Sequence, residues 1–329
     1  MYPGILNACT LGIGRRRHPI RCPTHRRSLF VHHPPARSKP RTTALVAAAS
    51  ATLLLALAGC TSSSPSEAAA AAAAKPLSQQ AFITRQLGLS SVDFGEYLRR
   101  QAFTLQSGTT EFVTAWESGD DDLARSLYAP TRSFYNRMLA ASASFPELDA
   151  SLDAGDSGWH AIEAQLWPLT AEENQGMPVR PATADQRQAV GQQLETDTKS
   201  LTGAVSGLRP TVEEQAAGVA ALMAGRGRAA AAGEQEPRSH TDLYDLQAYV
   251  DGSREVFSGL RPILVTQNAA LATTLDHRFD AAEGQLNALR TGVSFPGFDT
   301  LTGDQRQALQ AAVGDLTQSL GQVPQTLAG

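Results

Sequence analysis

The chain has 329 residues, with 28 Lys and Arg against 32 Asp and Glu, which gives a formal net charge of −4. This charge is divided unevenly, because the part before Cys60 holds nine basic residues and no acid. The remaining 19 Lys and Arg face all 32 acids, so the formal charge from Cys60 onward is about −13. Binding to a phosphate backbone draws on clustered Lys and Arg, so this acidic body excludes nucleic acid as an expected partner.

Residues 1–59 are predicted to be an export signal rather than a folded domain. The apolar run 44–58 carries no charge and is shorter than the roughly 20 residues that a helix needs to span a membrane, so it is typical of a signal h-region. The sequence Leu-Ala-Gly-Cys at 57–60 matches the bacterial lipobox, in which the Cys60 thiol takes the lipid. The alternative is a plain signal peptide with an incidental Cys60. The basic segment before the apolar run is long, which is explained by a twin-arginine-like signal at 26–30 or by an over-extended start.

Residues 60–77 predict a lipidated Cys60 followed by a flexible linker rich in Ser and Ala. Cys9 and Cys22 lie in the segment that would be removed, so Cys60 would be the one cysteine of the exported chain. No disulfide framework or cysteine metal site is then expected. The folded domain is predicted at residues 78–329.

Apolar residues recur at spacings of three and four through 190–208, 243–264 and 309–323, which is the period of a helix with one buried face. No convincing alternating strand pattern is present. Capping boxes, which mark helix starts, are predicted at four pairs: Ser118 with Asp121, Thr183 with Gln186, Ser239 with Asp242, and Thr302 with Gln305. Together these patterns predict an all-α fold of seven or eight helices, arranged as one bundle or as two bundles end to end.

The segment Gly-Trp-His-Ala-Ile-Glu at 158–163 contains the most informative pair of polar residues. A spacing of three places His160 and Glu163 on one face of a helix, where an imidazole nitrogen and a carboxylate can reach the same metal ion. The alternative is that His160 is a hydrogen-bonded residue packed among Trp159, Ile162 and Trp167.

Four further residues are candidate metal ligands: Asp153, Asp197, His240 and Asp242. Asp197 lies within an apolar stripe, and a buried carboxylate needs a partner or an ion, so the alternative is a buried pair with an Arg. His240 and Asp242 follow Ser239 at a predicted helix start, where capping is the alternative role. Asp153 could also simply end a helix.

Several ordered segments resemble one family. The run 158–163 resembles the Gly-x-His-x-x-Glu motif of the imelysin domain, and three further stretches resemble EfeO-type proteins: LYAPTR at 127–132, Leu-Asp at 148–149 with 152–153, and SHTDLYDLQ at 239–247. The resemblance covers about residues 80–325. The chain is therefore identified as similar to the imelysin-like EfeO/EfeM family, in the short form without a cupredoxin domain.

This resemblance implies an imelysin-like fold of two helical bundles and a metal site that includes the His-x-x-Glu pair. It also implies an extracytoplasmic lipoprotein, held in the periplasm or on the outer face of the cytoplasmic membrane, in an EfeUOB-like iron uptake system. Its partners would be the membrane, a ferrous iron permease and a haem peroxidase. The expected function is capture and hand-over of a metal ion without bond breaking, with iron first and copper or zinc as alternatives.

The chain departs from the family pattern where acids are expected, because Gln101, Asn136, Leu139 and the run 216–221 carry no carboxylate. Hard cations need several oxygen ligands, and one His with one Glu cannot hold them tightly. One alternative is therefore a decayed metal site in a structural or partner-binding module.

A second alternative function is binding of an acidic polysaccharide such as alginate. The basic patch for it would be formed by four residues: Arg99, Arg100, Arg132 and Arg137. A metallopeptidase is disfavoured, because catalytic zinc sites generally use three protein ligands and a general base, and the sequence offers one plausible pair.

Overall fold

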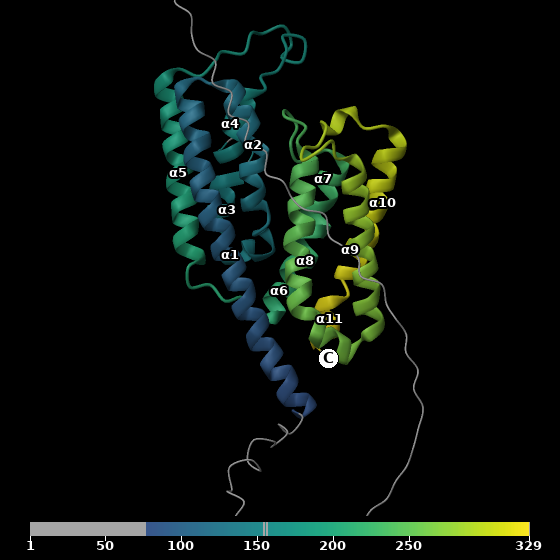
Figure 1. Ribbon diagram of the computed structural model, residues 1–329. Helices are drawn as coiled ribbons and strands as arrows, with labels where there is room; N and C mark the ends of the chain where they lie inside the picture. Colours follow the sequence, from purple (N-terminus) through teal and green to yellow (C-terminus); the bar gives the residue numbers. More distant parts are fainter. Residues whose placement is uncertain (1–76, 154, 156, 329) are drawn as a thin grey trace, which may run out of the picture. The chain divides into compact units, whose positions relative to one another are not determined.

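Helices account for most of the described chain in a computed structural model that covers residues 77–153, 155 and 157–328 (Figure 1). Within these ranges there is no strand, only one isolated bridge between Thr291 and Ser294. The predicted all-α fold is confirmed. The predicted export signal, the lipobox with Cys60 and nearly all of the linker lie outside the described residues.

The first group of helices is built around α1 (Gln79–Ser118), which begins after Ser78, whose side chain accepts a hydrogen bond from the Ala81 amide. Helix α1 packs along α2 (Asp121–Asn136) and α5 (Ala184–Val205). Two short helices, α3 (Pro146–Asp153) and α4 (Gly158–Leu166), pack against each other and against α5. The 3-10 turn η1 (Leu139–Ser144) leads from α2 to α3.

The second group is built around α8 (Asp242–Gln267), which contacts α9 (Ala269–Leu289), α6 and α7. Its other elements are α6 (Val212–Leu222), the π-helical turn η2 (Met223–Gly227), α7 (Arg228–Ala232), the 3-10 turn η3 (Phe298–Thr300), α10 (Gly303–Leu320) and α11 (Val323–Ala328). The described residues thus form eleven α-helices rather than seven or eight, because short helices and the π-helical interruption break up the longer runs. The predicted two bundles are confirmed, but the two groups lie side by side in Figure 1 rather than end to end.

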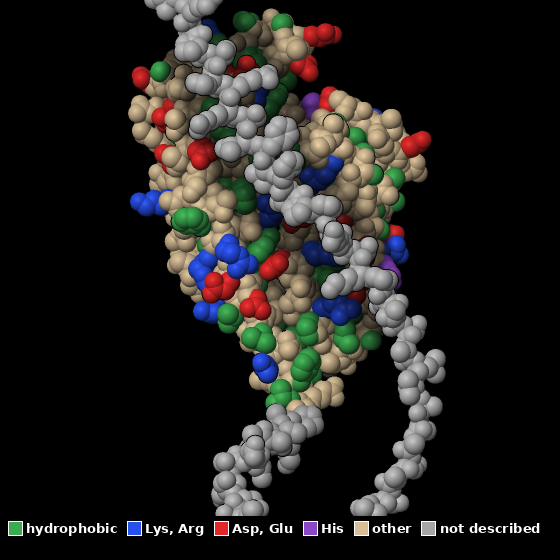
Figure 2. Space-filling model, viewed as in Figure 1, with side chains coloured by type: hydrophobic (Ala, Val, Ile, Leu, Met, Phe, Trp, Pro, Cys, Tyr) green, Lys and Arg blue, Asp and Glu red, His purple; other side chains and the backbone are tan. Residues whose placement is uncertain are grey.

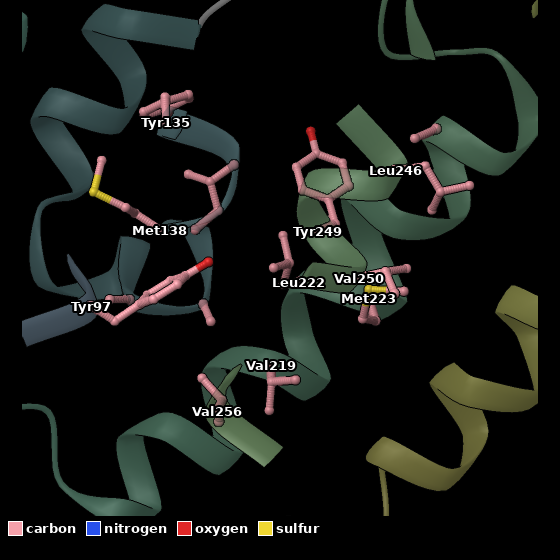
Figure 3. Packing of buried hydrophobic residues seen from close by; sticks show 14 of the residues in the cluster. Tyr97, Tyr135, Met138, Val219, Leu222, Met223, Leu246, Tyr249, Val250 and Val256 are labelled. Atoms are coloured by element: carbon pink, nitrogen blue, oxygen red, sulfur yellow. The ribbon is translucent and has the colours of Figure 1, made fainter. Parts of the chain in front are cut away.

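The core runs continuously from one group to the other, because α8 packs on both α1 and α2. Figure 3 shows this region from close by, with Tyr135 and Met138 on one side and Leu222 and Tyr249 on the other. The three predicted apolar stripes are buried at their large residues, for example at Leu194, Leu246 and Leu316. No helix among the described residues is long and apolar enough to cross a membrane.

Two of the four predicted capping boxes are present, at Thr183 with Gln186 and at Thr302 with Gln305. A third box that was not predicted starts α6, at Thr211 with Glu214.

The prediction at Ser118 is wrong, because Ser118 ends α1 and the side chain of Asp120 caps α2 instead. The prediction at Ser239 is also wrong, because α8 starts after Thr241 without a side-chain cap. The Ser239 hydroxyl is used elsewhere, as described below.

Candidate metal centre

Helix α4 starts immediately beside the end of α3, and this closeness places His160 next to Asp153. Gly158 begins α4 with a left-handed φ of 54°, and a Cβ added there would lie 2.1 Å from the carbonyl oxygen of Leu152. A residue with a side chain would be strained at this φ and would also clash. The buried Trp159 anchors the same turn, since its ring packs on those of Phe112 and Tyr128 at centroid distances of 5.0 and 5.8 Å.

His160 lies between two carboxylates. Its Nδ1 atom is 3.1 Å from Oε2 of Glu163, and its Nε2 atom is 3.4 Å from Oδ1 of Asp153. Burial lowers the pKa of His160, but the hydrogen bonds to Asp153 and Glu163 outweigh it and raise that pKa above its usual value. The imidazole therefore faces acidic partners rather than packing only among the neighbouring aromatic rings. Its side chain is 14% exposed, so an ion from solvent can reach it.

Glu163 has its second oxygen, Oε1, fixed by the loop before α8. This atom accepts hydrogen bonds from the backbone amides of Arg238 (3.2 Å) and Ser239 (2.8 Å), and from the Ser239 hydroxyl (2.8 Å). Burial raises the pKa of Glu163, but the hydrogen bonds from His160 and Ser239 outweigh it and lower that pKa to about 2. The Glu163 carboxylate is therefore ionised at neutral pH, and Oε2 remains directed at His160.

Glu236 is a third potential ligand that the sequence did not reveal. One ligand atom each from His160, Glu163 and Glu236 lie within 4.8 Å of one another, close enough to bind one ion. Oε2 of Glu236 accepts a hydrogen bond from the Tyr128 hydroxyl (2.9 Å) and lies 3.2 Å from the Ser239 hydroxyl oxygen. Burial raises the pKa of Glu236 well above its usual value. The position of Glu236 in a loop without helical periodicity explains why no pattern pointed to it.

Arg132 lies at the centre of the buried acids and is fully buried itself. Its guanidinium forms ion pairs with Asp153, Glu236 and Asp245. Asp245 also accepts a 2.6 Å hydrogen bond from the Asn136 amide. The prediction that Arg132 contributes to a surface patch is wrong, because its charge is used inside the protein.

A second guanidinium, that of Arg226, closes the cluster on the side of α3. It contacts Asp153 at 2.7 Å and Asp149 at 2.8 Å. The hydrogen bonds and ion pairs of the cluster connect six carboxylates, those of Asp149, Asp153, Glu163, Glu236, Asp242 and Asp245. Among the described residues, the ion pairs of these acids are with Arg132, Arg226 and His160, so six acids share at most three positive charges, which favours a bound cation or a proton.

A pocket of about 390 Å³ leads from the surface to this cluster. Its lining residues come from the ends of α3 and α4 and from the loop before α8, and include Asp153, His160, Glu163, Glu234 and Arg238. Glu236 lies behind these residues and does not line the pocket. An ion entering the pocket would therefore meet His160 and Glu163 first.

The other four predicted ligands do not belong to the group of residues that could hold one ion with His160 and Glu163. Asp197 is buried on α5, where it accepts hydrogen bonds from Ser151 (2.5 Å) and Gln193 (2.9 Å) instead of pairing with an Arg. Asp242 accepts hydrogen bonds from the amides of Gln235 (2.8 Å) and Glu236 (3.2 Å) and so shapes the loop that carries Glu236.

His240 adopts a φ of 55°, and its carbonyl accepts a 2.9 Å hydrogen bond from the Phe298 amide. It is not in the group that could hold one ion. Asp153 contacts the His160 ring but is engaged by two guanidinium groups.

The fold and this site define a class of all-helical protein with a buried cluster of imidazole and carboxylate groups that could hold a metal ion. The chain belongs to the imelysin family, whose family model, Peptidase_M75, matches residues 91–323. It is similar to the "Iron uptake system component EfeO" of Escherichia coli strain K12 and to the proteins of the same name from Shigella flexneri and Shigella sonnei strain Ss046. Each is 30% identical over 249 residues, which is 72% of this chain and 63% of the relative. The chain thus spans under two thirds of these relatives, and the predicted membership of the EfeO-like family is confirmed.

Proposed function

We propose that this protein binds a metal ion, with iron as its cargo, as a component of an extracytoplasmic iron uptake system. The observation that carries the proposal is the convergence of His160, Glu163 and Glu236 within 4.8 Å at the inner end of a solvent-connected pocket. The names of the relatives, which describe an iron uptake component, support iron as the cargo.

The donor set suits the proposed cargo. One imidazole and two carboxylates form a nitrogen and oxygen ligand set that suits ferrous iron, with zinc and copper as competitors. The acids missing at Gln101, Leu139 and Asn136 do not remove a member of this set. Gln101 lines a different pocket and Leu139 is buried in the core, whereas Asn136 lies in the cluster and donates to Asp245 but is outside the group formed by His160, Glu163 and Glu236. This argues against a decayed site.

The proposed activity is capture and release of an ion without bond breaking. A lipid on Cys60 would tether the protein outside the cytoplasmic membrane or in the periplasm, and a ferrous iron permease and a haem peroxidase remain the proposed partners. The lipid follows from the lipobox at 57–60 and the partners from the sequence resemblance, and neither rests on the described residues.

Polysaccharide binding is less well supported, since the predicted basic patch is largely neutralised. Arg132 is buried, Arg137 pairs with Asp251 at 3.1 Å, and Arg99 pairs with Glu96. On the face seen in Figure 2, blue and red side chains alternate instead of forming a continuous basic surface.

Calorimetric titration of the purified protein with ferrous iron under anaerobic conditions, and with zinc and copper, tests the proposal. We expect one ion per chain, and an affinity at least about tenfold lower for His160→Ala and for Glu163→Gln, because each removes one of few ligands. Matched controls are His277→Ala and Glu111→Gln, which change exposed residues of the same types. Absence of binding, or equal affinities of the His160→Ala and His277→Ala variants, would contradict the proposal.

A further inference from the structure

Arg132 resembles a bound cation in its surroundings. Its side chain is fully buried, and its three acidic partners come from three separate segments: Asp153 at the end of α3, Glu236 in the loop before α8, and Asp245 in α8. Each of these carboxylates is itself almost fully buried. Buried acids of this number need a positive charge among them.

This Arg132 position lies directly beside the proposed metal site, because the two share Glu236 and a second partner of Arg132, Asp153, contacts His160. Glu236 pairs with Arg132 and belongs to the group that could hold one ion with His160 and Glu163. Asp153 pairs with Arg132 and lies 3.4 Å from Nε2 of His160.

The hydrogen bonding of Arg132 is incomplete, although the residue is enclosed. Its Nε atom is buried and has no hydrogen-bond partner, and neither has the buried amide oxygen of Asn136, whose nitrogen donates to Asp245. The three buried carboxylates that contact the Arg132 guanidinium form an all-oxygen ligand set, of the kind that hard divalent cations such as Mn²⁺ prefer.

We propose that the Arg132 guanidinium fills a second cation position of the cluster, next to the position formed by His160, Glu163 and Glu236. Arg132 is thus a positioning residue that limits the cluster to one exchangeable ion and holds Glu236 within reach of that ion. A fixed positive charge beside the ion also weakens its binding, which suits a protein that must release its cargo. The first position rests on the proposed function, whereas the role of Arg132 is tested independently of it.

The test is the number of Mn²⁺ ions bound per chain by wild-type protein, Arg132→Met and Arg132→Lys, measured by elemental analysis after equilibrium dialysis. Met removes the charge and ends near the place of the Arg Nε atom, which leaves the position of the guanidinium carbon and terminal nitrogens open, whereas Lys keeps the charge. We expect Arg132→Met to bind one Mn²⁺ more than the wild type, and Arg132→Lys to bind the wild-type number. An unchanged number in Arg132→Met overturns the proposal.

Double variants locate the additional ion. Adding Asp245→Asn to Arg132→Met removes an acid that contacts Arg132 but is outside the His160 group, so the additional ion should be lost. Adding His160→Ala to Arg132→Met should leave the additional ion in place. The opposite pattern would place the ion in the His160 position and overturn the proposal.

Folding is measured on the same samples by thermal unfolding with and without Mn²⁺. We expect Mn²⁺ to raise the melting temperature of Arg132→Met more than that of the wild type, because the ion replaces the lost charge. Failure of Arg132→Met to fold even at saturating Mn²⁺ also counts against the proposal. If the wild type binds no ion but Arg132→Met binds one, the proposed function fails while the inference on Arg132 stands.

Discussion

Two buried acids of this protein, Asp197 on α5 and Glu163 on α4, both lie on helices but have different partners. Asp197 is satisfied by the neutral side chains of Ser151 and Gln193, whereas Glu163 faces His160 and belongs to a network with two guanidinium groups. The neutral donors satisfy the Asp197 carboxylate, so it has no need of a bound cation. A buried network with more acids than bases is stabilised by an additional positive charge, and a site for a cationic cargo requires this property.

Removing the positive charge of Arg132 should have the largest effect on stability of the changes considered. Arg132→Met in the absence of metal leaves three buried carboxylates without their cation, and we expect a loss of about 3–5 kcal/mol in the free energy of unfolding. Urea unfolding in the presence of a chelator measures this loss. The control, Arg278→Met, breaks an exposed pair with Asp315 and should cost less than about 1 kcal/mol. Similar losses in the two variants would show that the buried network is not the stronger one.

Gly158 tests how the backbone places His160 within the network. Gly158→Ala forces a side chain into a left-handed φ and against the Leu152 carbonyl, so we expect a loss of about 1–3 kcal/mol or more in stability, together with weaker metal binding. Gly314→Ala is the control, since its added methyl group meets no atom within 4 Å in the middle of α10 and should stabilise the helix by about 0.5–1 kcal/mol. Full metal affinity in Gly158→Ala would mean that the start of α4 does not position His160.

The pH dependence of metal binding tests the charged environment of His160. A metal ion needs the neutral imidazole, and hydrogen bonds to Asp153 and Glu163 raise the pKa of His160, so protons compete from a higher pH than for an ordinary His. Below that pKa, the apparent zinc affinity should fall about tenfold per pH unit, or about 1.4 kcal/mol. Glu163, with its pKa lowered to about 2, stays ionised over this range.

Calorimetry between pH 5.5 and 7.5 measures this slope, and the His160→Gln variant should give a shallower one. The same slope in both proteins would assign the competing proton to another group, such as Glu236, whose pKa is raised by burial.

The sequence could predict those features that depend on short spacings. His160 and Glu163 are one helical turn apart, and the caps at Thr183 and Thr302 follow from side chains three residues apart. The burial of Asp197 also follows from its apolar stripe.

Glu236 could not be predicted, because its place depends on a loop whose amides at 238 and 239 bind a carboxylate more than seventy residues earlier in the chain. The sequence places Arg132 at the surface for a similar reason. An Arg is rarely buried without partners, and here the partners come from three segments that only the fold brings together.

Asp197 supplies the smallest expected effect and the sharpest contrast with Glu163. Asp197→Asn retains an acceptor oxygen for Ser151 or Gln193 but puts an amide group where a carboxylate accepted both hydrogen bonds, so we expect a loss of about 1 kcal/mol in stability. Metal affinity should not change, because Asp197 is outside the group that could hold an ion. Glu163→Gln should give the reverse result, with a large loss of metal affinity. If Asp197→Asn weakened metal binding as much as Glu163→Gln, the two acids would belong to one site and the distinction between neutral and charged partners would fail.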